Sequence, residues 1–194
     1  MYVSIDVETT GLDTENFQVL QLGAVAWTSD DINQCRTFDM ILDPTRGPTR
    51  GNYGQPLVGD PYGLLMNAWL LEEIVNGRGA LYTTVMSEFS KFLHQFRVQH
   101  DDIQGGKYIW AVGQNFGKFD WQFLKNIPGF PVKLFGHRFT EVGTFMADRD
   151  GPHSGTEDFA RIAEKYSIGG ETHHALYDAK CTLAKLMETL DVRP

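Results

Sequence analysis

The sequence predicts an α/β or α+β fold built around a central mixed sheet. Three apolar strands follow one another near the start of the chain, and the short turns between them suggest an antiparallel meander. A fourth apolar strand occurs later, among segments with helical periodicity. Strands that are followed by a mixture of strands and helices are typical of a sheet flanked by helices.

Each predicted strand is a run of alternating or continuous apolar residues that ends at turn-forming residues. The third strand, for example, stops at Asp43-Pro44. The predicted strands are residues 2–8, 18–27, 36–42 and 108–113.

The predicted helices show apolar residues at spacings of three and four. The last of them has a core face that includes Leu176, Ala179 and Leu183. The predicted helices are residues 64–75, 82–98, 116–126, 156–166 and 174–190.

Residues 44–63 contain four Pro and five Gly and are expected to form one long loop. Such loops in compact domains are often functional, and a tolerated surface insertion is the alternative. Arg46, Arg50 and Tyr53 could contact phosphate or stack on a base. Their alternative role is that of solvated loop residues.

Composition and charge limit the class of protein. We expect the 194 residues to form a single domain, 1–194, and the 42% apolar content is ordinary for a soluble protein. Two cysteines without a C-x-x-C pair support neither a zinc ribbon nor a disulfide framework. No apolar run is long enough to span a membrane, so we expect a cytoplasmic protein with no membrane partner. The net charge of −8 argues against coating long duplexes, but not against gripping a nucleic-acid end through metal ions.

Two carboxylates, Asp6 and Glu8, lie at the end of the first predicted strand. Side chains alternate between the faces of a strand, so both acids share one face. Neighbouring carboxylates repel by about 4 kcal/mol at an effective dielectric constant of about 20. Residues 1–35 contain no Lys or Arg, so a cation such as Mg²⁺ or Mn²⁺ is an attractive partner. The alternative is a strand end at which both acids are merely solvated.

Asp120 lies within the apolar stripe of the predicted helix 116–126. A carboxylate directed at a core is costly unless it is paired or close to a metal. The alternative is a hydrogen bond to Asn115 or to a tryptophan N–H.

Asp178 lies at the edge of the core face in the first turns of the last predicted helix. His173 lies five residues earlier, on the preceding loop, where it could reach the same site. A histidine beside a metal cluster can take a proton from water, because its reference pKa is about 6.5. The alternative is that His173 and His174 form a solvated cap of the helix.

Three separated motifs agree in type and order: D-x-E on the first strand, N-x-x-x-F-D at the middle helix and H-x-A-x-x-D at the last helix. Together they resemble the three exonuclease motifs of the DEDDh (DnaQ-like) family of 3′→5′ exonucleases, which includes the proofreading subunit of bacterial DNA polymerase, RNase T and oligoribonuclease. The resemblance extends from Asp6 to Asp178. It implies a ribonuclease H-like α/β fold, in which helices flank a central mixed five-stranded sheet made of the antiparallel meander and parallel strands.

The resemblance also implies a catalytic set with two divalent metal ions, Mg²⁺ or Mn²⁺, about 4 Å apart on the scissile phosphate. Asp6 would bridge both ions, and Glu8 and Asp178 would bind the ion that carries the attacking water. His173 would take the proton from that water, while His174 fills a variable position of the family. The implied catalytic residues are Asp6, Glu8, Asp120, His173 and Asp178, of which the four acids are the metal ligands.

Contacts to the 3′-terminal nucleotide are implied as well. Thr9 matches a nucleotide-contacting position, and Leu12 matches the apolar residue that wedges between the last two bases. Where relatives carry His-Gly, this chain has Met66-Asn67-Ala68, which leaves stacking by Met66 open against core packing. The expected substrate-contacting residues are Thr9, Thr10, Gly11, Leu12, Met66, Asn115 and Phe119.

The expected activity is release of nucleoside 5′-monophosphates from the 3′ end of single-stranded nucleic acid. DNA is the first expectation, and an oligoribonuclease-like or RNase T-like RNA exonuclease is the alternative. A catalytically silent binding or scaffold module is the alternative from another class. Proofreading would require a polymerase or replication partner, and the sequence does not indicate an oligomeric state.

Overall fold

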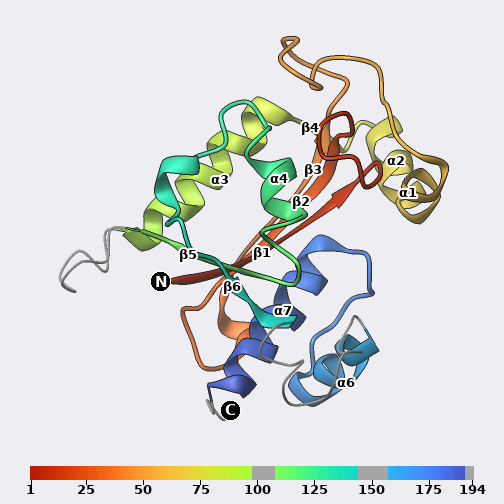
Figure 1. The fold of residues 1–194 in the computed structure, drawn as a ribbon. Helices are drawn as coiled ribbons and strands as arrows, with labels where there is room; N and C mark the ends of the chain where they lie inside the picture. Colours follow the sequence, from red (N-terminus) through yellow and green to blue (C-terminus); the bar gives the residue numbers. More distant parts are fainter. Residues whose placement is uncertain (98–107, 144–156, 191–194) are drawn as a thin grey trace.

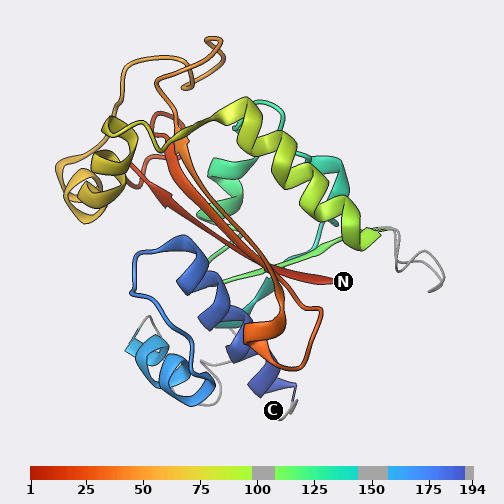
Figure 2. The ribbon, with the colours of Figure 1, turned by 180° about the vertical axis from the view of Figure 1, so that it is seen from behind.

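A computed structural model describes residues 1–97, 108–143 and 157–190. In these residues a six-stranded mixed sheet, with the strand order β4-β3-β2-β1-β5-β6, separates two layers of helices. Figures 1 and 2 show α3 and α4 on one side of the sheet and α6 and α7 on the other. The predicted mixed sheet flanked by helices is therefore confirmed.

The centre of the sheet is the predicted antiparallel meander. Strand β1 pairs antiparallel with β2, and β2 pairs antiparallel with β3. Strand β5 lies parallel to β1 on its other side. The four strands are β1 (Tyr2–Thr9), β2 (Val19–Ala26), β3 (Arg36–Asp43) and β5 (Trp110–Gly113).

The predicted count of five strands is wrong, because the described sheet has six. The sheet is extended at its edges by two short parallel strands, β4 (Ala80–Leu81) beside β3 and β6 (Thr140–Glu141) beside β5. A strand of two residues carries no alternation of side chains, so its sequence has no periodic signal.

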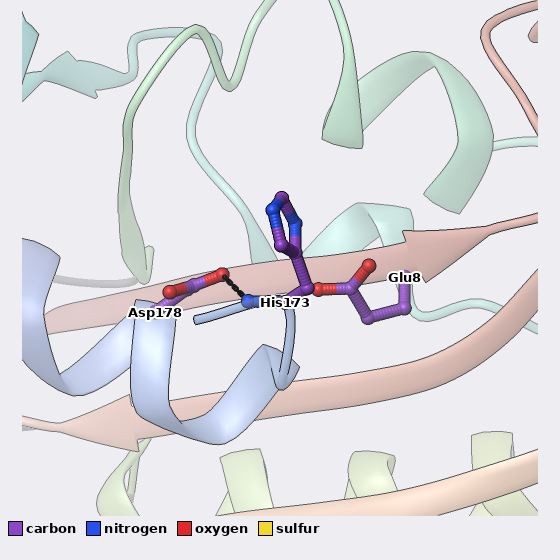
Figure 3. Close-up of side chains that lie close together, drawn as sticks. All are labelled: Glu8, His173 and Asp178. Carbon is purple, nitrogen blue, oxygen red and sulfur yellow. Dashed lines mark hydrogen bonds between the residues drawn. The ribbon is translucent and has the colours of Figure 1, made fainter. Parts of the chain in front are cut away.

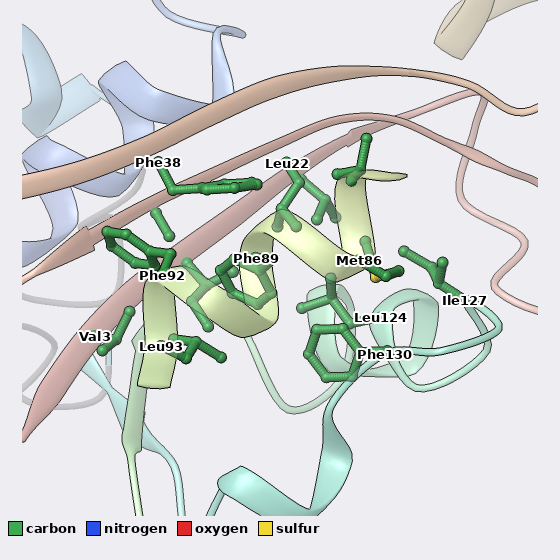
Figure 4. Close-up of a cluster of buried hydrophobic side chains, with 14 of the residues drawn as sticks. Val3, Leu22, Phe38, Met86, Phe89, Phe92, Leu93, Leu124, Ile127 and Phe130 are labelled. Carbon is green, nitrogen blue, oxygen red and sulfur yellow. The ribbon is translucent and has the colours of Figure 1, made fainter. Parts of the chain in front are cut away.

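One hydrophobic core fills the space between the sheet and helices α3 (Tyr82–Arg97) and α4 (Asp120–Leu124). Figure 4 shows Phe89 and Met86 of α3 packed among side chains of the sheet and of the segment that follows α4. The valine and isoleucine residues of β1 point into this core. Asp6 and Glu8 consequently face the opposite layer, as the alternation predicts.

The second core lies under helices α6 (Glu157–Tyr166) and α7 (Ala175–Thr189). Helix α7 crosses β2 at Gly23, where an added Cβ atom would lie 2.3 Å from the carbonyl carbon of Ala175. Because only glycine permits this approach, the first turn of α7 rests directly on the sheet beside β1.

The predicted helix 64–75 is two helices, α1 (Pro61–Met66) and α2 (Ala68–Val75). The side chain of Asp60 caps α1 by accepting a 2.7 Å hydrogen bond from Gly63 N, and Pro61 occupies the first turn. Asn67 then ends one helix and begins the next.

The predicted helix 116–126 is much shorter, since α4 begins only at Asp120. Asn115 has φ 61°, a left-handed conformation that a helix cannot include. The Glu141 carboxylate then accepts backbone hydrogen bonds from Phe116 and Gly117, which holds the chain in a turn.

The predicted helices 82–98, 156–166 and 174–190 correspond to α3, α6 and α7, and their described ends agree to within one residue. The predicted last residue of the first, 98, and the predicted first residue of the second, 156, lie outside the described ranges. Short 3-10 helices cover Ile32–Gln34 and Val132–Leu134. No helix in the described part of the chain is long and apolar enough to cross a membrane.

The proline- and glycine-rich loop between β3 and α1 is held in place by packing and hydrogen bonds. Tyr53 is only 2% exposed, packs against the Tyr82 ring at 5.3 Å and accepts a hydrogen bond from Val19 N. The suggestion that Tyr53 could stack on a base is therefore wrong. Arg46 pairs with Asp43 at 3.8 Å.

Candidate active site

Asp6 and Glu8 line a pocket of about 250 Å³ at the carboxyl-terminal end of β1. The register of the sheet places Asp6 opposite Gly23 and Glu8 opposite Gln21. Because Gly23 admits the first turn of α7, residues of that turn come within reach of both acids.

Asp178 lies in that first turn and is buried. Its Oδ2 atom accepts a 3.1 Å hydrogen bond from the backbone N–H of His173, which has a left-handed φ of 62°. Figure 3 shows His173 between Asp178 and Glu8. One potential ligand atom from each of these three side chains lies within 4.8 Å of the other two. Among the described residues they form a candidate site for a divalent cation.

Asp120, the first residue of α4, lies close to this group but outside the lining of the pocket. It is buried, and its Oδ1 atom accepts a 3.1 Å hydrogen bond from the backbone N–H of Val7. This bond ties α4 to β1 and holds a third carboxylate beside Asp6, whose pKa it raises.

The acids of the site have strongly raised pKa values. Loss of hydration raises the pKa of Glu8 to about 7 and of Asp178 to about 7, and the negative charge of Asp178 adds to the effect on Glu8. Burial raises the pKa of Asp120 to about 8. The pKa of Asp6 lies well above its usual range, first because of burial and then because of the charges of Asp120, Asp178 and Glu8. The negative charges of neighbouring carboxylates therefore make ionisation of Asp6, Glu8 and Asp120 more costly.

A bound cation fits these observations. Among the residues that the structure describes, no Lys or Arg lines the pocket, and none forms a hydrogen bond with the buried Asp178 Oδ1 atom. Buried carboxylates are normally paired, hydrogen-bonded or bound to metal. Carboxylate oxygens suit Mg²⁺ or Mn²⁺.

The two neighbouring histidines have different surroundings. His173 is exposed and lines the pocket. The His174 ring instead stacks on Trp69, with ring centroids 5.1 Å apart and an interplanar angle of 13°. Its Nε2 atom lies 3.9 Å from Asp39 Oδ2, and both ring nitrogens lie 3.4 Å from Gln21 Nε2. Only His173 is placed to act in the pocket.

The structure brings most of the expected substrate-contacting residues to the pocket and leaves two outside its lining. Thr10 is buried, and its hydroxyl group donates a 2.6 Å hydrogen bond to Val58 O. Asn115 is exposed in the turn before α4. The members that line the pocket are Thr9, Gly11, Leu12, Met66 and Phe119.

Besides Val7 of β1, the pocket is lined by three residues that the sequence analysis did not identify as site residues: Tyr62, Gly63 and Asn67. Tyr62, Gly63 and Asn67 belong to α1 or to the break that follows it. An added Cβ atom at Gly63 would lie 2.6 Å from the Cα atom of Gly11, so α1 packs directly on the loop after β1. Asp60 followed by Pro61 is a helix-start signal that could have placed this helix correctly.

Comparisons with solved structures find the same fold in nucleases. Exonuclease X in complex with 5′-overhanging duplex DNA is 14% identical, with a TM-score of 0.55 over 98% of this chain and 92% of that one. Cell-death related nuclease 4 (CRN-4) is 17% identical, with a TM-score of 0.61 over 98% of this chain and 63% of that one. The metal-free ExoI–ssDNA complex of E. coli is 14% identical, with a TM-score of 0.59 over 97% of this chain and 39% of that one. Likeness at such identities shows the fold alone.

The comparison with family models is decisive. No match was found among curated proteins. The model of the Rv2179c-like 3′-5′ exoribonuclease domain, however, matches residues 1–190, which is nearly the whole chain. The resemblance to DnaQ-like exonucleases that the three motifs indicated is thereby confirmed. The chain belongs to the Rv2179c-like 3′-5′ exoribonuclease domain family and is a 3′-5′ exonuclease.

Proposed function

We propose that this protein removes nucleotides from the 3′ end of single-stranded RNA by metal-dependent hydrolysis. The observation that carries the proposal is the group of four carboxylates, Asp6, Glu8, Asp120 and Asp178, beside His173 and without a Lys or Arg in the pocket. RNA is favoured over our first expectation of DNA because the matching family is described as exoribonucleases. The DNA complexes among the similar structures support only the fold at their low identity.

Four carboxylates carry more negative charge than one divalent ion neutralises, which supports the two-ion arrangement. Asp6, Glu8 and Asp178 would hold the ions, with Asp120 close behind Asp6. Bound there, divalent ions would neutralise the acids and stabilise the negative charge that develops on the phosphate.

His173 is proposed as the general base that accepts a proton from the attacking water. Its exposed ring can reach water and the pocket, and the hydrogen bond from its backbone N–H to Asp178 fixes the loop that carries it. Leu12, which is 73% exposed at the pocket rim, and Phe119 are proposed to contact the terminal nucleoside. The expected products are a nucleoside 5′-monophosphate and a strand shortened from its 3′ end.

The proposal is tested by digestion of RNA and DNA oligonucleotides of the same sequence, labelled at the 5′ end. With Mn²⁺ or Mg²⁺, we expect a ladder of strands shortened from the 3′ end, formed faster from RNA, and no ladder in EDTA. Asp6→Ala should lose nearly all activity and keep its fold, whereas the matched variant Asp30→Ala, at an exposed position, should behave as wild type. Equal activity of Asp6→Ala and wild type would contradict the proposed site, and faster digestion of DNA would contradict the choice of RNA.

A second test compares the two histidines. His173→Ala should lower kcat by about 10²- to 10⁴-fold, the usual contribution of a general base. His174→Ala should have a smaller effect, because its ring stacks on Trp69 outside the pocket. Single-turnover rates of the two variants, measured at saturating metal, show which histidine contributes to the chemical step. A larger loss in His174→Ala would reverse the assignment.

A third test concerns stability in the absence of metal. Glu8, Asp120 and Asp178 have pKa values of about 7 to 8 in the folded protein, and the pKa of Asp6 is raised as well, against about 4 in an unfolded chain. Between these values the folded state binds more protons, so the free energy of unfolding should decrease as the pH rises from about 4 to about 8. Denaturation in EDTA across this range measures the effect, and added Mn²⁺ should restore stability at the upper end. Stability that increases with pH over this window would contradict the carboxylate cluster.

A further inference from the structure

The active-site pocket is too small to hold more than the end of a strand. Its volume is about 250 Å³, below the range of about 300–1,000 Å³ that is usual for clefts around drug-sized ligands. If the proposed function is correct, the nucleotides that precede the 3′ end must lie on another part of the surface. In a chain of net charge −8, that surface needs local positive charge to hold phosphates.

The loop after β3 holds one arginine that is free to contact phosphate. The backbone groups of Arg50 and Tyr53 exchange two hydrogen bonds, of 3.0 and 3.1 Å. Buried Tyr53 anchors this turn, and the Tyr82 hydroxyl donates a 2.8 Å hydrogen bond to Pro48 O. Unlike Arg46, Arg50 forms no ion pair with any residue that the structure describes. Its backbone is thus fixed while its guanidinium group stays available.

This turn forms one wall of a hollow of about 640 Å³, which we call the basic hollow. Helix α3 forms another wall and contributes Lys91 and His94 together with hydroxyl groups of Thr83, Ser87 and Ser90. Lys91 also pairs with Glu88 at 2.6 Å, so its charge is partly balanced. No carboxylate is among the residues of the described ranges that line the basic hollow. Cationic and hydroxyl side chains around an open hollow are the usual partners of phosphate oxygens.

A second hollow, of about 360 Å³, which we call the connecting hollow, is lined by residues that are close in sequence to the linings of the basic hollow and of the active-site pocket. Its lining includes Gly51, next to Arg50, and Thr14, two residues after Leu12 of the active-site pocket. Because successive Cα atoms are about 3.8 Å apart, the Cα atom of Gly51 lies about 3.8 Å from that of Arg50, and the Cα atom of Thr14 lies within about 8 Å of that of Leu12. Lys125 and the amide side chains of Asn52, Gln122 and Asn126 line this connecting hollow, with Glu15 as its one carboxylate.

We propose that the connecting hollow and the basic hollow bind the phosphates of the RNA strand upstream of its 3′-terminal nucleotide. Arg50 is the central contact, supported by Lys91, His94 and Lys125. The protein therefore selects single strands several nucleotides long over dinucleotides. The surface holds the strand by its phosphates rather than by stacking on its bases, because Tyr82, the tyrosine that lines the basic hollow, is buried and exposes no ring.

The test is binding of 5′-labelled RNA oligonucleotides, from a dinucleotide to about 12 nucleotides long, the span of common single-strand site sizes. Binding is measured by fluorescence anisotropy in EDTA, where no turnover occurs, at several salt concentrations. The variant is Arg50→Gln. The matched control is Arg36→Gln, an exposed arginine at the opposite end of β3, which changes net charge equally.

Wild type and Arg36→Gln should bind the long strand more tightly than the dinucleotide. This gain, the ratio of the affinity for the long strand to the affinity for the dinucleotide, should be about tenfold smaller in Arg50→Gln than in wild type, as expected for loss of one charged hydrogen bond. The slope of log affinity against log salt should fall by about 0.7, the value for one phosphate contact on a single strand. With metal present, the ratio of the KM values for dinucleotide and long strand should fall in the same way while kcat for the long strand is kept.

The proposal is overturned if Arg50→Gln keeps the wild-type gain, if Arg36→Gln loses it equally, or if wild type binds both lengths with the same affinity. These outcomes are separate from failure of the proposed function. A wild-type protein that releases no nucleotide, yet shows the length-dependent binding, would contradict the exonuclease activity and leave the upstream surface supported.

Discussion

Repulsion among carboxylates that are buried or, in the case of Asp6, half-buried is the constraint on which the rest of the site depends. Asp6, Glu8, Asp120 and Asp178 come from one strand and two helices, and each is raised in pKa by burial and, in several cases, by the others. Such a group destabilises a fold unless protons or cations neutralise it. In the part of the chain that the structure describes, the lining of the pocket supplies no Lys or Arg for this purpose. The most economical account is that the protein is built to bind divalent ions and holds protons in their absence.

The fold keeps these acids together through a few close contacts. The absence of a side chain at Gly23 lets the first turn of α7 rest on β2, which brings Asp178 to the end of β1. The hydrogen bond from Val7 N to Asp120 fixes α4 from the other layer. The acids therefore meet at the carboxyl-terminal end of β1, where both helical layers contact the sheet. The hydrophobic core on each face of the sheet holds the helices, and with them the acids, in place.

Much of this arrangement could be predicted from sequence because its signals are local. Alternation in β1 places Asp6 and Glu8 on one face, and the helical periodicity of α7 places Asp178 in its first turns. The features that could not be predicted depend on contacts distant in sequence. Glu141 holds the turn that delays α4 until Asp120, and pairing with β3 makes a strand of Ala80–Leu81.

The structure of the loop between β3 and α1 also depends on contacts distant in sequence and could not be predicted. Its proline and glycine content predicted irregular structure, but the burial of Tyr53 against Tyr82 follows only from packing across the fold. That packing removes one suggested nucleic-acid contact and leaves Arg50 exposed in a fixed turn. The separation of α1 from α2 at Asn67, which brings α1 over the pocket, was likewise hidden within an apolar run that resembles one helix.

The most direct test of the account is a count of bound metal ions. Mn²⁺ is titrated into the protein in the presence of the product nucleotide AMP, and free Mn²⁺ is measured by electron paramagnetic resonance. The account predicts two ions bound per chain in wild type and in Asp30→Asn, and a loss of at least one from Asp178→Asn. Absence of binding in wild type, or unchanged binding in Asp178→Asn, would contradict the central claim that these carboxylates form a cation site.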